Sequence, residues 1–246
     1  RSGFMRLLTR LVVNRADVIT VRDEESAEEL KRIGVAPGKV EVTADSVLTL
    51  NPVSRVKGKS ILAEAGLDPY KPIIGVSVRE WPGSQRCLQQ LAVALGKLSE
   101  RYHAQVAILP LQVSMDRKAC QLLHGYLPET GHKVVLLEST YSTEEFLSIV
   151  GSFRMLIGMR LHGLIFAAVM KVPLMAISYD PKVDSFVKAI GVRAVGTVET
   201  LSAERVEQAA EALWGQEQSV QERRIAEMKK LAQSNAAKAF ALLHGE

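Results

Sequence analysis

The sequence lacks several features that would place it in a common class of protein. Its 246 residues include two cysteines, Cys87 and Cys120, which lie far apart and without the spacing of a metal site. We therefore expect structural thiols in a reducing compartment. No apolar run approaches the roughly 20 residues of a membrane-spanning helix. The net charge of +4 includes no polybasic block, which does not suggest sequence-specific nucleic-acid binding and fits anionic small molecules or loose contact with an acidic membrane surface.

Several catalytic signatures are also absent. The sequence has no Gly-Lys-Ser/Thr phosphate loop, and no Gly-x-Gly-x-x-Gly follows a strand-like run, so nucleotide hydrolysis and ordinary dinucleotide binding are not expected. It has no serine nucleophile elbow and no histidine-rich metal cluster. The sequence therefore gives no indication of a bound metal or a nucleotide cofactor.

What the sequence does contain, over its larger part, is an alternation of apolar, strand-like runs with helical patterns. Alternation on this scale predicts right-handed crossovers and a parallel sheet covered by helices on both faces. The expected strands span residues 73–78, 106–111, 134–137, 154–158 and 174–179.

The chain divides into two parts in this interpretation. Residues 1–50 contain a strand-helix-strand fragment that is too small to stand alone and resembles the closing part of a Rossmann-like domain. Residues 51–58 carry turn formers and are assigned as a linker, and residues 59–246 as a second Rossmann-like domain. The tail consists of two helical stretches, the first with Ser202 as its N-cap, and a long closing helix that reaches back to the first domain would explain its length.

Polar side chains follow the expected strands, and a parallel sheet brings such positions to one edge. Guanidinium groups bind carboxylate and phosphate bidentately, and a lysine adds a mobile point charge. A histidine at a helix N-terminus can bind an anion or transfer a proton near neutral pH. The sequence therefore predicts a site for a phosphorylated carboxylic acid. The residues concerned are Arg79, Glu80, Gln112, Glu138, Arg160, His162, Asp180 and Lys182.

Each of these residues also has a purely structural interpretation. Arg160 could pair with an acidic neighbour, and His162 could be a hydrogen-bonded core histidine. Asp180 and Lys182 are of types common in turns and caps. Arg79 could be an exposed ion-pair partner. The functional interpretation rests on several such groups meeting at one sheet edge.

Several motifs together resemble a known family, the polysaccharide pyruvyl transferases, and most of all the bacterial enzymes that pyruvylate cell-wall polymers for the anchoring of surface-layer proteins. The most specific motifs lie in the second part of the chain, and weaker ones lie in the first. The matching stretches are residues 158–168, 172–173 and 177–183, with 14–17, 21–26 and 43–45 in the first part.

The resemblance implies an α/β fold of glycosyltransferase-B type with two Rossmann-like domains, and we expect the N-terminal acceptor domain to be largely missing from this chain. It implies phosphoenolpyruvate as the donor, a co-substrate rather than a cofactor. Carried over by position, Arg160, Leu161 and His162 would bind the donor, and Lys182 would be a further binding or catalytic group. The first residues resemble the end of a Gly-Pro-x-Arg-Ser segment of the family, which adds Arg1 as a candidate.

The implied acceptor is a lipid-linked amino-sugar saccharide, a precursor of a cell-wall polysaccharide, at the cytoplasmic face of the membrane. Ketal formation from an enol phosphate needs a proton at the methylene carbon and a base for the sugar hydroxyl, for which Asp180, Asp45 and Glu138 are candidates. This scheme needs no metal. Two alternatives remain open: a sugar-nucleotide-dependent glycosyltransferase of the same architecture, and a non-catalytic sugar- or phosphate-binding module.

Overall fold

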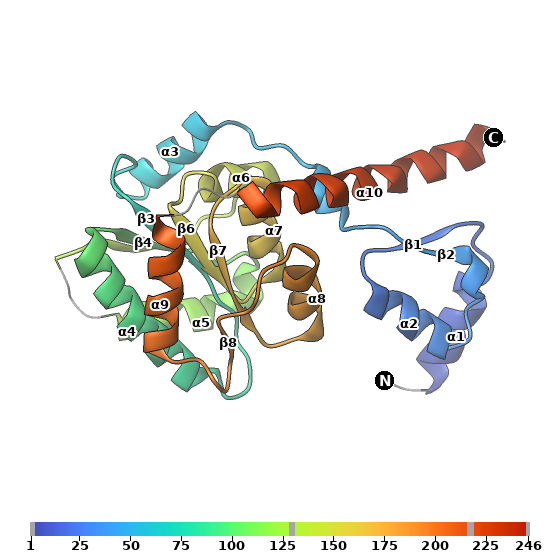
Figure 1. The fold of residues 1–246 in the computed structure, drawn as a ribbon, viewed down its shortest axis with the longest axis horizontal. Coiled ribbons are helices and arrows are strands. Elements are labelled where there is room, and N and C mark those ends of the chain that lie inside the picture. The colour runs from blue at the N-terminus through green and yellow to red at the C-terminus, as the bar shows by residue number, and fades with distance from the viewer. Residues whose placement is uncertain (1–2, 128–130, 216–218, 245–246) are drawn as a thin grey trace. The chain divides into compact units, whose positions relative to one another are not determined.

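A computed structural model describes residues 3–127, 131–215 and 219–244, which form two compact units (Figure 1). The first unit comprises Arg1–Leu50 together with Arg223–Glu246, and the second comprises Asn51–Glu222. The whole tail through residue 246 is expected to belong to the second domain, whereas residues Arg223–Glu246, most of the last helix, group with the first unit. The two units are described separately below.

The second unit is built on a parallel sheet with the strand order β5-β4-β3-β6-β7-β8 in the part of the chain that the structure describes. The chain starts in the middle at β3, moves outward through β4 and β5, and then returns to β6 on the other side of β3. The sheet therefore has a topological switch point between β3 and β6, where open α/β sheets bind their ligands. The strands are β3 (Ile73–Ser77), β4 (Gln105–Ile108), β5 (Val134–Leu136), β6 (Met155–Gly158), β7 (Leu174–Ser178) and β8 (Gly196–Thr197).

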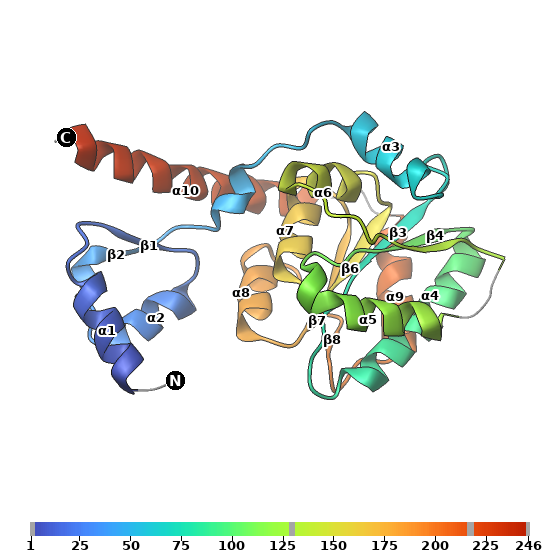
Figure 2. The same ribbon diagram turned by 180° about the vertical axis from the view of Figure 1, so that it is seen from behind.

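Helices cover the sheet in two layers (Figures 1 and 2). One layer contains α4 (Ser84–Tyr102), which packs against α5 (Val113–Tyr126) and α9 (Ala203–Trp214). In the other layer, α6 packs against α3 and α7, and α7 also contacts α8. The helices of this second layer are α3 (Arg55–Glu64), α6 (Thr143–Val150), α7 (Leu161–Val169) and α8 (Pro181–Ala189).

The prediction of a linker over residues 51–58 is wrong for residues 55–58, because α3 begins at Arg55. The side chain of Ser54 caps this helix by accepting a hydrogen bond of 3.0 Å from the backbone N–H of Lys57. Gly58 is a packing glycine and not a turn residue, since a Cβ there would lie 2.0 Å from the backbone oxygen of Ser148 in α6. A glycine that permits two helices to approach closely gives the same sequence signal as a glycine in a turn.

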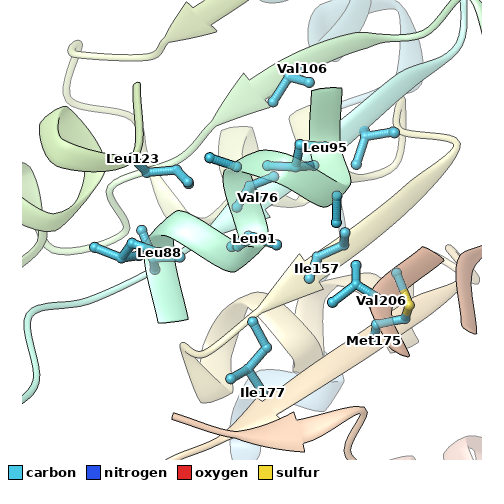
Figure 3. Close-up of a cluster of buried hydrophobic side chains, with 14 of the residues drawn as sticks. Val76, Leu88, Leu91, Leu95, Val106, Leu123, Ile157, Met175, Ile177 and Val206 are labelled. Carbon is cyan, nitrogen blue, oxygen red and sulfur yellow. The ribbon is translucent and has the colours of Figure 1, made fainter. Parts of the chain in front are cut away.

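The core of the second unit lies between the sheet and the layer formed by α4, α5 and α9. Figure 3 shows Leu88, Leu91 and Leu95 of α4 facing strand residues such as Val76 and Ile157. Four strands, β3, β4, β6 and β7, are buried along their whole length. Because both faces of these strands are covered, their sequences are continuous apolar runs rather than alternating ones. Burial on both faces fixes the strand ends, and with them the residues that follow.

The first unit contains α1 (Gly3–Val13), α2 (Glu24–Arg32) and a parallel pair of strands, β1 (Ile19–Val21) and β2 (Val40–Val42). The last helix, α10 (Ser219–His244), returns to this pair. The side-chain amide of Asn235 donates to the backbone oxygen of Ala44 at 3.1 Å and accepts from the hydroxyl of Thr43 at 2.6 Å. The expectation of a closing helix that reaches back to the first part of the chain is confirmed.

In the described residues, no helix combines the length and apolar character needed to cross a membrane.

Candidate functional site

The carboxyl edge of the large sheet carries the candidate site at its switch point. Ser77, the last residue of β3, pairs with Gly158, the last residue of β6, and the backbone N–H of Met159 donates to the Ser77 oxygen at 2.7 Å. Arg79 and Arg160 lie two residues beyond these paired positions. The fold therefore places two arginines that are far apart in the sequence just beyond the ends of neighbouring strands.

Arg160 is held by the buried carboxylate of Asp116, in the first turn of α5, which was not among the residues predicted from the sequence. The Nε atom of Arg160 donates to both carboxylate oxygens at 2.8 Å, and Nη2 also pairs with Asp116. Nη2 makes a longer bond of 3.3 Å to the side-chain oxygen of Gln112. The side chain of Asp116 is 0% exposed and that of Arg160 is 14% exposed. The structural interpretation of Arg160 as an ion-pair partner is therefore correct, and the pair fixes where its guanidinium lies.

Arg79 lies between two aromatic rings. Its guanidinium carbon is 5.6 Å from the ring centroid of Trp81 and 5.1 Å from that of Tyr179, and Nη1 donates to the Tyr179 hydroxyl at 3.1 Å. The two rings meet edge to face with centroids 4.9 Å apart. Stacking of this kind orients a guanidinium while leaving its charge unneutralised. Among the residues that the structure describes, its buried Nε has no hydrogen-bond partner.

A second buried polar atom without a partner lies beside the N-terminus of α7. The hydroxyl of Ser77 is fully buried and makes no hydrogen bond within the described chain. It faces Gly163 in the first turn of α7, where a Cβ would lie 3.4 Å from the Ser77 oxygen. Arg160, the N-cap of this helix, provides no side-chain hydrogen bond to the first turn in the described structure. Uncapped N–H groups at a helix N-terminus attract anions, and the Ser77 hydroxyl adds a further donor.

His162, also in the first turn of α7, is exposed and is therefore not a core histidine. Its ring lies 6.4 Å from that of Phe166, one helical turn later. Leu161, in contrast, is buried, so only its backbone is available to a ligand. The motif thus points its histidine outward and anchors its leucine in the core, which places the imidazole at the same helix N-terminus as the unpartnered serine hydroxyl.

The β7 edge contributes Asp180 and Lys182, both half-buried. Asp180 caps α8 by accepting from the backbone N–H of Lys182 at 3.0 Å, and its other oxygen lies 3.3 Å from the Lys182 ammonium. That ammonium is also 5.5 Å from the ring centroid of Tyr179. The ring of Tyr179 therefore contacts two cations, Lys182 and Arg79, which links the β3 and β7 edges into one cationic site.

The remaining predicted residues lie elsewhere. Glu138 is exposed after β5, the outermost strand, which β4 and β3 separate from β6. Asp45 belongs to the first unit, where it lies 3.2 Å from Arg22 and lines a cavity of about 440 Å³ at the carboxyl ends of β1 and β2. Glu80 pairs with Lys118 on the surface at 2.9 Å. Arg1 lies outside the described residues.

The two cysteines are buried and take no part in this site. Burial, followed by the nearby charge of Asp116, raises the pKa of the Cys120 thiol to about 12. Burial and then Glu199 raise the pKa of Cys87 to about 11. Both thiols are therefore protonated at neutral pH and do not act as nucleophiles.

Within the described residues, no group of His, Cys, Asp and Glu side chains is arranged to hold a metal ion.

Sequence comparison identifies the family of this chain. Residues 1–181 match the family model described as Polysaccharide pyruvyl transferase. The chain belongs to this family. The match includes Arg79, Arg160, His162 and Asp180, and it ends one residue before Lys182. A search among curated proteins finds no significant relative.

Solved structures of similar fold include an enzyme named for a UDP-sugar and a protein solved with UDP. A structure of S. aureus MnaA with UDP shares 14% identity at a TM-score of 0.66, covering 99% of this chain and 66% of its own. A putative UDP-N-acetylglucosamine 2-epimerase from Listeria monocytogenes shares 14% at 0.62, with 94% and 61% covered. Sucrose-phosphate synthase from Thermosynechococcus elongatus shares 14% at 0.60, with 100% and 63% covered. These similarities confirm the expected glycosyltransferase-B type of fold, and the chain spans less than two thirds of each of these proteins.

Proposed function

We propose that the protein transfers pyruvate from phosphoenolpyruvate to a sugar of a cell-wall polysaccharide precursor and forms a pyruvate ketal. The observation that supports this most directly is the cationic site at the carboxyl edge of the sheet, where Arg160 is the N-cap of α7 and the ring of Tyr179 contacts both Arg79 and Lys182. Phosphoenolpyruvate is a small molecule with two anionic groups, and arginines bind both carboxylate and phosphate well. Family membership supports the same assignment.

The two anionic groups of the donor have separate places in this proposal. The phosphate binds at the uncapped N-terminus of α7, where the backbone N–H groups and the Ser77 hydroxyl face it. The carboxylate binds Arg79, whose buried Nε lacks a partner among the described residues. Arg160 and Lys182 neutralise the charge that develops on the departing phosphate, a contribution that is often the largest single one in catalysis.

The chemistry then needs one proton donor and one base. His162 protonates the methylene carbon of the donor, the adjacent carbon accepts a sugar hydroxyl oxygen, and the hydroxyl proton passes to a carboxylate. Asp180 is the candidate base in the second unit, because it lies beside Lys182. The bond from this carbon to the phosphate oxygen then breaks and phosphate leaves, and a second hydroxyl of the same sugar attacks the carbon, closes the ketal and returns its proton to His162. Asp45 and Glu138 stay as further candidates for the base.

The acceptor in this proposal is a lipid-linked amino-sugar saccharide that the enzyme meets at the cytoplasmic face of the membrane. A role in anchoring surface-layer proteins is the most specific form of this proposal.

A nucleotide-sugar enzyme is the second candidate. The observation that favours it is that structural neighbours include a UDP-N-acetylglucosamine 2-epimerase from Neisseria meningitidis bound to UDP-GlcNAc. At 14% identity this similarity shows the fold alone. Pyruvyl transfer, by contrast, is supported by residues of this chain itself: Arg160 and His162 follow β6, and Lys182 follows β7.

Thermal unfolding with added ligands separates the two candidates. A ligand that binds only the folded state raises the unfolding temperature as its concentration exceeds its Kd. We expect protection by phosphoenolpyruvate and none by UDP-sugars. Arg160→Ala and His162→Ala, made in this chain and in one extended at its N-terminus, should reduce phosphate release with donor and acceptor by about a hundredfold or more. Protection by UDP-sugars alone, or full turnover by the double variant, would disprove the proposal.

A further inference from the structure

The amino edge of the large sheet, opposite the candidate site, carries a second concentration of positive charge. Two cavities of about 440 and about 590 Å³ open there, and they adjoin each other because Tyr70, Lys71 and Pro72 line both. Their linings include Ile73 and Gln105, the first residues of β3 and β4. The cavities therefore follow the amino ends of the central strands.

Nearly all the charge in these linings is positive. One acidic residue, Asp68, lines the cavities, and its carboxylate accepts a hydrogen bond of 3.0 Å from the backbone N–H of Tyr70. Neither Lys59 nor Lys71 forms an ion pair with another residue in the described structure. The ammonium of Lys59 instead lies 5.2 Å from the ring centroid of Tyr70. The basic side chains of the two linings, apart from histidines, are Arg55, Lys59, Lys71, Lys133 and Arg154.

Large apolar side chains project beside these cations. Tyr70 is 88% exposed and Val56, in the first turn of α3, is 78% exposed. Exposed apolar groups mixed with lysine and arginine are typical of surfaces that lie on a lipid bilayer, where the cations meet anionic headgroups and aromatic rings enter the interfacial layer. A site for one small anion would gather its cations at one point, whereas these are distributed along two cavities.

We propose that this amino-edge surface, formed by Arg55, Val56, Lys59, Tyr70 and Lys71, docks on a bilayer that contains anionic phospholipids. The surface lies at the edge of the sheet opposite Arg160, so the candidate site of the second unit stays open while the surface is docked. The inference rests on charge and exposure alone and does not depend on the donor chemistry.

Vesicle co-sedimentation tests the proposal with the whole chain. We expect binding to phosphatidylcholine vesicles that contain phosphatidylglycerol, little binding to pure phosphatidylcholine, and weaker binding as salt is added. Each basic residue near an anionic surface strengthens binding by about fivefold. The double variant Lys59→Gln/Lys71→Gln should therefore bind about 25-fold more weakly. The matched control Lys188→Gln/Arg205→Gln removes two exposed charges that line neither cavity and should retain most of the binding.

A second pair of substitutions tests the apolar part of the surface. Val56→Ser with Tyr70→Ser should weaken vesicle binding several-fold without changing its dependence on salt. All four positions are exposed, so the unfolding temperature should stay near that of the wild type. Protection by phosphoenolpyruvate should also persist in every variant, which separates failure of this inference from failure of the proposed function.

Four results would overturn the inference. They are equal binding to neutral vesicles, equal losses in the test and control double variants, displacement from vesicles by millimolar glycerol phosphate at constant ionic strength, and tighter binding of a single-stranded oligonucleotide than of the anionic vesicles. The third would indicate a site for free phosphate, and the fourth a nucleic-acid surface.

Discussion

The buried pair between Asp116 and Arg160 offers the sharpest test of how the site is built. Asp116→Asn keeps the shape of the side chain and removes its charge, which leaves the Arg160 guanidinium beside an amide. Removing one partner of a buried ion pair costs about 3–5 kcal/mol. Because Arg160 is 14% exposed and can turn toward water, we expect a loss at the lower end, about 3 kcal/mol.

Thermal and urea unfolding of the variant measure this loss. At about 2–4 °C per kcal/mol for a unit of this size, the unfolding temperature should fall by about 6–12 °C. The matched control is Glu80→Gln, which removes a carboxylate that pairs with Lys118 on the surface at 2.9 Å, with both side chains more than half exposed. Exposed pairs contribute about 1 kcal/mol at most, so this control should shift the unfolding temperature by no more than about 4 °C.

The same variant tests whether Asp116 orients Arg160 for the donor. Hydrogen bonds to charged groups contribute about 1.5–3 kcal/mol, so a displaced guanidinium should weaken phosphoenolpyruvate binding by about tenfold or more. Titration of the ligand against the unfolding temperature gives this ratio. An Asp116→Asn protein as stable as the control would refute the energetic reasoning. A protein that is destabilised but binds the donor normally would show that the pair is structural only.

Three further predictions concern other parts of the second unit. Gly163→Ala should weaken protection by phosphoenolpyruvate, because its Cβ would lie 3.2 Å from the Leu111 side chain and 3.3 Å from that of Ser77, and these neighbours would have to shift slightly; unchanged protection would remove the helix N-terminus from the proposed site. Leu91→Ala, at a fully buried position of α4, should lower the free energy of unfolding by about 2–5 kcal/mol in a urea titration. The buried thiols predict that the protein loses stability at alkaline pH. Burial raises the pKa of Cys87 to about 11 and that of Cys120 to about 12 in the folded state, whereas an unfolded cysteine has a pKa near 8.5. The contribution of the two thiols to the free energy of unfolding is therefore complete below pH 8.5 and is lost as the pH rises toward the folded-state pKa values. The double variant Cys87→Ala/Cys120→Ala should therefore lose less stability between pH 8.5 and pH 11 than the wild type does, and an identical loss would contradict this account.

Much of the fold could be predicted from the sequence because strands buried on both faces leave unbroken apolar runs. The five strands expected in the second domain correspond to β3 to β7, with ends that coincide or differ by at most three residues. β8 was not predicted, since a strand of two residues carries no periodicity. The helix that begins at Arg55 was not predicted, because Gly58 gives the same sequence signal as a glycine in a turn.

The candidate site could be predicted less completely. Residues that directly follow strands, such as Arg79 and Arg160, could be found because parallel topology brings strand ends together. Asp116 could not be found in this way, because an acidic residue in the first turn of a helix is the ordinary pattern. Its pairing with Arg160, 44 residues later, exists only in three dimensions. In the sequence, Ser77 looks like an ordinary strand residue. It is recognised as a candidate only in the structure, where its buried hydroxyl has no hydrogen-bond partner among the described residues.

The return of α10 to the first unit has a consequence for folding during synthesis. The hydrogen bond between Thr43 and Asn235 joins residues 192 positions apart, so the ribosome must produce the whole second unit before the first can complete its contacts. Contacts between such distant residues form late because a long loop must close first. The second unit, which is continuous in sequence, can fold as soon as it emerges. A nascent chain that stops before Asn235 would therefore carry a finished second unit and an unfinished first one, and the incomplete unit is where a chaperone or protease would act.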